Sequence, residues 1–341
     1  MNTLTRILCR GTLLLGLGAA SASAQSYHVA KTTVLGGDGG WDYVALDSVG
    51  HRLFIARQNR VMVVDEETGR LLGEIPGLTR AHGIALAYDA GRGFATSGPD
   101  SAVTMFDLNT LKVQGHITAA VDADAVLYDP ATKHIFTFNG DAHSSSVIDP
   151  SIGRRIGTID LGGGPEFGVS AGDGKLYVNL EDKSAIVEID AAAMQVVRRW
   201  SLAPCERPTG LAIDREHHRL FSGCGNKVMA ISDAKAGTLI TTVPIGAYVD
   251  AAAFDPGTQL AFSSNGDGTL TLVHEDAPDK FRVVANVPTR RGARTMALDP
   301  VSHRVYLVTA DFGPTPAATP QQPRPRPAII PGTFTLIVCE P

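Results

Sequence analysis

The sequence predicts an all-β fold assembled from seven copies of one short unit. Each copy begins with an apolar run ending in Asp or Ala, turns into an aromatic-centred run, and adds a third apolar run. The first runs end 40 to 44 residues apart, at Asp47, Ala87, Asp129, Ala171, Asp214, Asp255 and Asp299. A period of about forty residues with several short strands per unit is typical of a β-propeller, whose blades are antiparallel sheets around a central channel.

The runs inside each unit have the pattern of strands. In the first copy, residues 41–47, 51–56 and 60–65 are short, alternating or β-branched, and separated by polar turns. A fourth run, residues 70–76, is expected to form the outer edge of the blade. We therefore expect seven four-stranded blades.

The two ends of the chain complete the prediction. The third runs end near Asp65, Asp107, Asp149, Asp190, Ser232, His274 and Cys339, so the seventh unit holds an insertion, residues 311–331. Only two residues follow Cys339, which leaves the seventh unit without an outer strand. Residues 27–36 resemble the outer strands, and pairing them with the last blade removes the open sheet edge. One seven-bladed domain over residues 27–341 follows.

The composition limits location and partners. A net charge of −5 argues against a nucleic-acid-binding surface, which needs a basic stripe. Arg6 and Arg10, an apolar stretch over 11–20, and Ala22-Ser23-Ala24 predict a signal peptide over residues 1–24. This apolar stretch is too short to span a membrane, and no other stretch is long enough. We expect an exported monomer, periplasmic or secreted.

The repeats resemble those of a known family. Residues 174–179 (Gly-Lys-Leu-Tyr-Val-Asn) and 146–149 (Ser-Val-Ile-Asp) are similar to the YVTN-type repeats of the YncE-like family of exported seven-bladed propellers. The similarity extends over residues 27–341. It implies the fold and export but little about activity, because propellers include both enzymes and binding proteins.

One polar position recurs in every unit. Counting back five residues from the end of each first run gives Asp42, His82, Asp124, Glu166, Thr209, Asp250 and Arg294. Inner strands start at one face of a propeller, so these seven side chains are expected to ring one mouth of the channel. We call them the ring.

Several interpretations of the ring remain open. Propeller mouths are commonly wet, and these residues can simply be solvated. Alternatively they bind a cationic or polyhydroxylated ligand, or a divalent metal such as Ca²⁺ or Mg²⁺ through Asp42, His82, Asp124, Glu166 and Asp250. Carboxylates on both sides of His82 are expected to raise its pKa, which suits a general acid better than a metal ligand.

The insertion and the cysteines lie near the same face. The prolines of residues 311–331 favour an extended course, as a lid over the mouth through Arg324 and Arg326, a partner surface, or a tolerated loop. Cys205 and Cys224 flank one predicted hairpin, and export favours a disulfide over a reactive or metal-binding thiol pair. Arg57, Asn139, Asn179 and Asn265 recur at second-run ends and are expected to be turn residues first.

The sequence therefore favours an exported binding module for a small molecule, a metal or an envelope protein. The alternative is a metal-dependent hydrolase or lyase of the lactonase-like propeller kind, in which a central ion polarises a carbonyl. Whether the protein is an enzyme stays open at this level.

Overall fold

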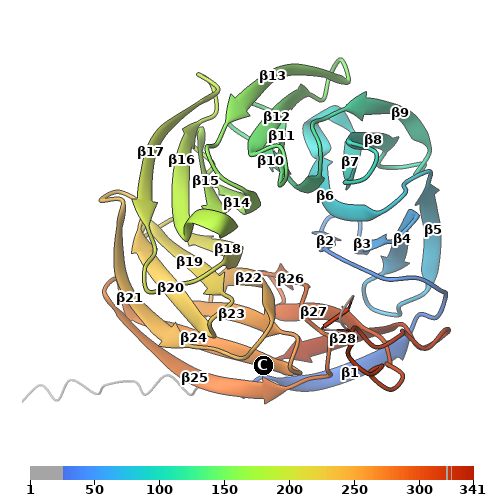
Figure 1. The fold of residues 1–341 in the computed structure, drawn as a ribbon. Helices are drawn as coiled ribbons and strands as arrows, with labels where there is room; N and C mark the ends of the chain where they lie inside the picture. Colours follow the sequence, from blue (N-terminus) through green and yellow to red (C-terminus); the bar gives the residue numbers. More distant parts are fainter. Residues whose placement is uncertain (1–25, 320–321, 324) are drawn as a thin grey trace, which may run out of the picture.

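The computed structural model describes residues 26–319, 322–323 and 325–341, which form a closed ring of seven four-stranded antiparallel sheets (Figure 1). Each sheet is one blade, and blades one to six place their strands in chain order from the axis to the rim. The predicted all-β seven-bladed propeller is confirmed. The predicted signal peptide, residues 1–24, lies outside the described residues.

The first three blades follow the repeat of the sequence. Blade one comprises β2 (Val44–Asp47), β3 (Arg52–Arg57), β4 (Arg60–Asp65) and β5 (Leu71–Pro76). Blade two comprises β6 (Ala81–Ala87), β7 (Arg92–Ser97), β8 (Ala102–Asp107) and β9 (Val113–Thr118). Blade three comprises β10 (Ala123–Asp129), β11 (His134–Asn139), β12 (Ser144–Asp149) and β13 (Arg154–Asp160).

The next three blades repeat this order. Blade four comprises β14 (Pro165–Ser170), β15 (Lys175–Leu180), β16 (Ala185–Asp190) and β17 (Gln195–Ser201). Blade five comprises β18 (Pro208–Asp214), β19 (Arg219–Cys224), β20 (Val228–Asp233) and β21 (Thr238–Pro244). Blade six comprises β22 (Val249–Asp255), β23 (Leu260–Asn265), β24 (Thr269–Ala277) and β25 (Lys280–Pro288).

Blade seven joins the two ends of the chain, as the sequence predicts. It comprises β26 (Met296–Asp299), β27 (Arg304–Thr309), β28 (Thr335–Glu340) and, as its outer strand, β1 (His28–Val34). β1 pairs antiparallel with β28, from Val34 opposite Thr335 to His28 opposite Glu340. Closure leaves no sheet edge exposed between blades seven and one.

The hydrophobic core lies between adjacent blades. Each second strand contributes a buried aromatic residue to it. These residues are Phe54, Phe94, Phe136, Tyr177, Phe221, Phe262 and Tyr306, and none is more than 4% exposed. Between blades seven and one, for example, Leu53 and Ile55 pack with Tyr306 and Leu336. Such burial is the main stabilising contribution of each interface.

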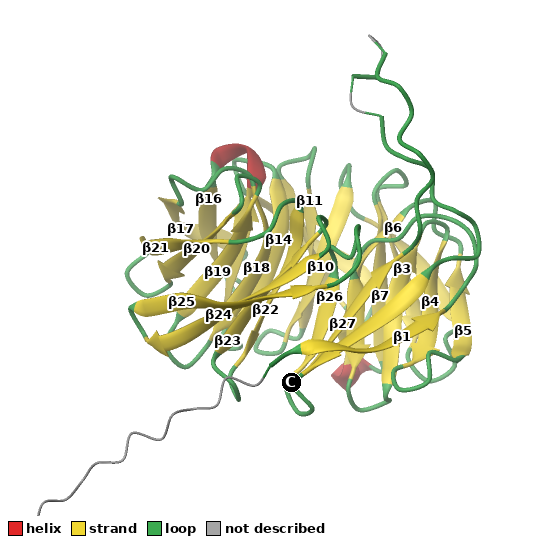
Figure 2. Cartoon of the chain, turned by 90° about the horizontal axis from the view of Figure 1, so that it is seen from below, coloured by secondary structure: helices red, strands yellow, loops and turns green. Residues whose placement is uncertain are grey.

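Helices have a minor part in this fold. The described residues contain two single-turn 3₁₀ helices, η1 (Tyr88–Ala90) and η2 (Glu181–Lys183), which lie on opposite faces of the disc (Figure 2). No helix among the described residues has the length and apolar character needed to cross a membrane.

The insertion of blade seven leaves the disc on the face that carries η2 (Figure 2). Its base is a narrow two-stranded stem, in which Phe312 pairs with Ile329 and the Gly313 amide donates to the Ala328 carbonyl. Phe312 packs against Trp41 of blade one, with ring centroids 6.0 Å apart. Arg326 is exposed, whereas Arg324 lies outside the described residues. The stem fixes the start of the insertion on the disc.

Candidate functional site

Most ring residues lie in an irregularity of the inner strand. In five blades the pairing of the first two strands shifts register at the ring position, between Ala81 and Ile84, Ala123 and Val126, Pro165 and Gly168, Pro208 and Leu211, and Val249 and Ala251. In blades one and seven the regular inner strand begins only after the ring residue. Bulges re-aim side chains and end regular pairing, which frees this position from the alternation of the strand.

The inner strands approach one another closely at this level. A Cβ atom added to Gly210, which follows Thr209, would lie 2.5 Å from the Ala252 backbone nitrogen of the next blade. Only glycine permits this approach. Thr209 itself donates its hydroxyl to the Val249 carbonyl, 3.0 Å away. Thr209 therefore joins two blades and is not free to contact a ligand through this proton.

Side chains of the preceding blade hold several ring backbones in place. Thr295 Oγ1 donates to the Asp42 carbonyl at 2.8 Å, Ser264 Oγ to the Arg294 carbonyl, and Thr96 Oγ1 to the Asp124 carbonyl. Ser264 and Thr96 lie on the second strand of the preceding blade, and Thr295 directly precedes its inner strand. The ring is thus placed by contacts between blades as well as by each blade alone.

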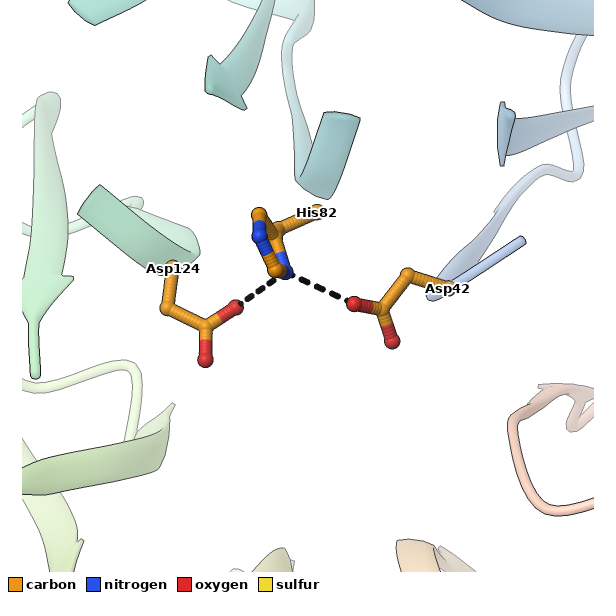
Figure 3. A group of neighbouring side chains, drawn as sticks. All are labelled: Asp42, His82 and Asp124. Carbon is orange, nitrogen blue, oxygen red and sulfur yellow. Dashed lines mark hydrogen bonds and ion pairs between the residues drawn. The ribbon is translucent and has the colours of Figure 1, made fainter. Parts of the chain in front are cut away.

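Five ring side chains form one connected chain of ion contacts. His82 Nδ1 donates to Asp42 Oδ2 at 2.7 Å and lies 2.8 Å from Asp124 Oδ1 (Figure 3). On the other side of Asp42, Arg294 Nη2 lies 3.7 Å from Asp42 Oδ1, and its Nε donates to Asp250 Oδ2 at 2.5 Å. The order around the mouth is Asp124, His82, Asp42, Arg294, Asp250.

The contacts shift the ionisation of these groups. Burial alone would lower the pKa of His82, but Asp124 and Asp42 raise this pKa to about 10, so the imidazole is protonated at neutral pH. Burial raises the pKa of Asp250 to about 6, against the opposing effect of Arg294. Asp250 and Asp42 raise the pKa of Arg294 above its usual value despite its burial.

Two buried atoms of the five ring side chains joined by ion contacts lack a hydrogen-bond partner among the described residues. Asp124 Oδ1 contacts His82 Nδ1 outside hydrogen-bond geometry, because the single Nδ1 proton points to Asp42. His82 Nε2 also has no acceptor. Unsatisfied buried polar atoms are rare, and they indicate water, an ion or a ligand that completes the site.

Glu166 stands apart from the ion contacts. Its carboxyl makes no hydrogen bond or ion pair with the residues that the structure describes. Burial, and then the charges of Asp124 and Asp250, raise its pKa well above the usual value. The raised pKa favours the protonated form of Glu166, which can donate a proton or a hydrogen bond.

An aromatic contact lies beside the ring. Tyr43, which directly precedes β2 of blade one, and Phe167, in β14 of blade four, have ring centroids 5.0 Å apart, although two other blades separate theirs along the chain. Burial, followed by Asp250 and Glu166, raises the pKa of Tyr43 well above its usual value. Each of the two aromatic residues directly follows a ring residue, at a position where the other blades have small residues. An aromatic residue at this position in two blades is the sequence signal that could have predicted the contact.

Arg57 organises the approach to Asp42. It is fully buried, and its guanidinium donates to the carbonyls of Asp38, Gly39 and Gly40 and lies 3.6 Å from the centroid of the Phe334 ring. Burial lowers its pKa to about 10. Arg57 thus fixes the segment 38–40, which leads to the ring residue Asp42. Sequence reasoning missed this role, because Arg57 stands beside a turn and is expected from the sequence to be a turn residue.

The structure confirms the predicted disulfide. Cys205 and Cys224, 19 residues apart, are bonded in blade five, and Cys224 ends β19 on the ring face. Cys339 is a buried free thiol whose pKa burial raises to about 12.

The predicted site residues fall into three groups. Asp42, His82, Asp124, Asp250 and Arg294 are in contact; Glu166 lies within electrostatic reach of three of them; Thr209 is bound to backbone. Of the five predicted metal ligands, Asp42, His82 and Asp124 offer donor atoms within 4.8 Å of one another. Asp250 instead pairs with Arg294.

Comparisons with known proteins support the fold alone. No family model matches the chain, and no curated protein sequence matches it. A structure titled Kuenenia stuttgartiensis hydrazine synthase superposes with a TM-score of 0.69 at 17% identity, covering 78% of this chain and 91% of that chain. A chain of a mitotic checkpoint complex superposes with a TM-score of 0.72 at 13% identity, covering 99% of both chains. Since 1817 chains of solved structures match, the likeness indicates a common scaffold and no particular activity.

Proposed function

We propose that this protein is an exported propeller of the YncE-like kind that binds a small cationic or polyhydroxylated molecule at its ring. The observation that supports it most is Asp124 Oδ1, a buried carboxylate oxygen with no hydrogen-bond donor among the described residues. A ligand that donates a hydrogen bond here completes the site. The neighbouring ion contacts hold Asp124 and His82 in place before binding, which lowers the ordering cost.

The charge of the ring favours a cation. His82 and Arg294 supply positive charge to the ring, whereas Asp42, Asp124, Asp250 and Glu166 supply four carboxyl groups, and burial and neighbouring charges favour the protonated form of Glu166. The carboxyl groups therefore outnumber the two cations. An organic ammonium ion supplies both a further positive charge and the missing donor.

Binding of defined probes tests this proposal. Thermal shift and calorimetry with putrescine, tetramethylammonium and a sugar alcohol are expected to detect a ligand of the wild-type protein that Asp124→Asn no longer binds. Asp141→Asn is the matched control, because Asp141 is an exposed carboxylate in a turn of the same blade. Equal responses of the wild type and Asp124→Asn to every probe would contradict the proposal.

A metal-dependent hydrolase or lyase is the second proposal, supported by the convergence of Asp42, His82 and Asp124. Because metal ligation needs a neutral imidazole, an ion at these residues must displace the proton of His82. Ca²⁺ and Mg²⁺ prefer oxygen ligands and would rely on the two carboxylates. Elemental analysis of protein purified without chelator separates the two proposals, since only this one requires a stoichiometric metal that Asp124→Asn loses.

An envelope protein is the third class of partner we propose, bound through the insertion. The exposed insertion projects from the ring face on a fixed stem, which suits a partner surface (Figure 2). The Gly313 amide contacts the Ala328 carbonyl, so the segment between them can be removed and its ends rejoined. Crosslinking in intact cells is expected to capture a partner with the wild type and not with this deletion. Unchanged crosslinks would contradict this role.

Export is part of the proposal. The basic and apolar pattern of residues 1–24 and the Cys205–Cys224 disulfide support an oxidising compartment, periplasmic or extracellular. Mass spectrometry of the protein from its native host is expected to find Gln25 as the first residue. A cytoplasmic product that keeps its first residues would contradict export.

A further inference from the structure

A second histidine–carboxylate cluster lies at the other end of the inner strands. Asp214 is the last residue of β18, the strand that carries Thr209 near its start, so the cluster lies on the face opposite the ring. His217 follows in the turn after β18, and Glu275 belongs to β24 of blade six. We call these three residues the rear cluster.

The three side chains offer donor atoms at short range. His217 Nδ1 lies 2.6 Å from Asp214 Oδ2 and 3.3 Å from Glu275 Oε1. All three donor atoms lie within 4.8 Å of one another. Asp214 is 1% exposed and Glu275 4%, whereas the His217 side chain is 31% exposed. The carboxylates are therefore buried, and the imidazole leaves access from solvent.

Glu275 has no hydrogen-bond donor among the described residues. Both of its carboxylate oxygens are buried without a partner. The nearby cation Arg219 is engaged elsewhere, because its guanidinium contacts Asp233 at 3.0 Å and Asp279 at 3.2 Å and donates to the Pro278 carbonyl. A buried carboxylate without partners is strongly unfavourable unless a proton or a cation occupies the site.

The other blades show that the fold does not need these residues. Three residues after the inner-strand Asp, Thr132, Thr258 and Ser302 donate their hydroxyls to Asp129, Asp255 and Asp299. His217 stands where these hydroxyl residues stand. Blades two, four and five have Leu108, Ala191 and Ala234, all buried, directly after the third-strand Asp.

Glu275 occupies the position of these apolar residues. The amides of Glu66, Leu108, Ala191, Ala234 and Glu275 all donate to the carbonyl of the turn after the inner strand, at His51, Gly91, Gly174, His218 and Gln259 respectively. The position therefore carries a glutamate in blades one and six. His217 of blade five and Glu275 of blade six meet at Asp214. Glu275 differs from Glu66, whose Oε1 contacts His51 Nδ1 at 2.8 Å, because both carboxylate oxygens of Glu275 lack a hydrogen-bond partner among the described residues.

We propose that Asp214, His217 and Glu275 bind one divalent transition-metal ion, Zn²⁺ being the ion that the donor set fits best. One imidazole nitrogen with two carboxylates suits Zn²⁺ better than Ca²⁺ or Mg²⁺, which prefer oxygen ligands. Three protein ligands leave a coordination position to water. The ion replaces the donors that Glu275 lacks.

Zinc titration of the purified full-length protein tests this proposal. After removal of bound metal, calorimetry with Zn²⁺ and absorption spectra with Co²⁺ are expected to show one site, and Zn²⁺ is expected to raise the melting temperature. The double variant His217→Thr with Glu275→Ala replaces each residue with its equivalent in another blade: Thr132 of blade three for His217, and Ala191 of blade four for Glu275. It is expected to fold and to bind Zn²⁺ at least roughly a hundredfold more weakly.

The control variant is Asp124→Asn, which alters the ring and is expected to bind Zn²⁺ like the wild type. Three results would overturn the proposal: no Zn²⁺ binding by the wild type, unchanged binding by the double variant, or loss of binding in Asp124→Asn instead. The first of these would indicate a proton shared between Asp214 and Glu275. The last would place the ion at the ring.

Discussion

The ring and the rear cluster each place a histidine between two carboxylates, at opposite ends of the inner strands, but their charges are balanced differently. In the ring, the protonated His82 lies between Asp42 and Asp124, and Arg294 joins Asp42 to Asp250. In the rear cluster, both carboxylate oxygens of Glu275 lack a hydrogen-bond donor among the described residues, and the ion contact of Glu275 with His217 Nδ1 spans 3.3 Å. The ion contacts of the ring thus leave one carboxylate oxygen, Asp124 Oδ1, without a donor, whereas the rear cluster leaves both oxygens of Glu275 without one.

Asp42→Asn is expected to have the largest effect on stability, because Asp42 is the link between His82 and Arg294. Removing its charge takes one of two carboxylate partners from the buried His82 and from the partly exposed Arg294, and we expect the free energy of unfolding to fall by about 2 kcal/mol. Chemical denaturation measures this change. The exposed-site control Asp141→Asn is expected to stay within about 0.5 kcal/mol of the wild type. A loss no larger than that of the control would show that the ring is not a cooperative network.

Glu275→Leu is expected to have the opposite sign in metal-free protein. It places the residue type of Leu108 at a position where a buried carboxylate lacks donors. We expect the free energy of unfolding to rise by about 1 kcal/mol, because an unsatisfied buried group is removed. The same variant should gain no stability from added Zn²⁺. Destabilisation of the metal-free protein would mean that Glu275 has a structural partner.

The pH dependence of stability should report the ring through His82. Its folded-state pKa of about 10 exceeds the ordinary value of 6.5, so the folded protein binds the proton more tightly than the unfolded chain. The stabilisation is complete below pH 6.5 and is lost as the pH rises through about 10. Denaturation curves across this window should show a decline that His82→Gln lacks. Parallel profiles for both proteins would contradict the protonated ring.

His217→Thr is expected to have the smallest effect on metal-free protein. The threonine hydroxyl can donate to Asp214 as Thr132 donates to Asp129. We therefore expect the free energy of unfolding to change by no more than about 0.5 kcal/mol, while Zn²⁺ affinity falls. Thermal unfolding with and without Zn²⁺ measures both effects. A large loss of stability without metal would make the His217–Asp214 contact structural.

Sequence reasoning predicted much of this architecture because propeller blades repeat. The period identified one equivalent polar position in each blade. The missing outer strand of the last blade predicted its pairing with the N-terminal strand, which β1 and β28 confirm. Sequence reasoning did not predict the contact between Tyr43 and Phe167, because register shifts at the ring break the alternation from which side-chain direction is inferred.

The ion contacts and the rear cluster needed coordinates. Whether Arg294 turns to Asp42, Asp250 or solvent depends on a long side chain with several rotamers, which a repeat position does not specify. His217 and Glu275 belong to different blades and come together only when blade six packs on blade five. His217 does replace the hydroxyl residue found at its position in three other blades, but a single sequence does not show that it faces Glu275.

The pairing of β1 with β28 sets an order of events during synthesis. β1 is the first strand to be made, and its partner β28 is the last. The seven-bladed ring cannot close on the ribosome before β28 (Thr335–Glu340) has been synthesised. Until then β1 has no partner strand in blade seven.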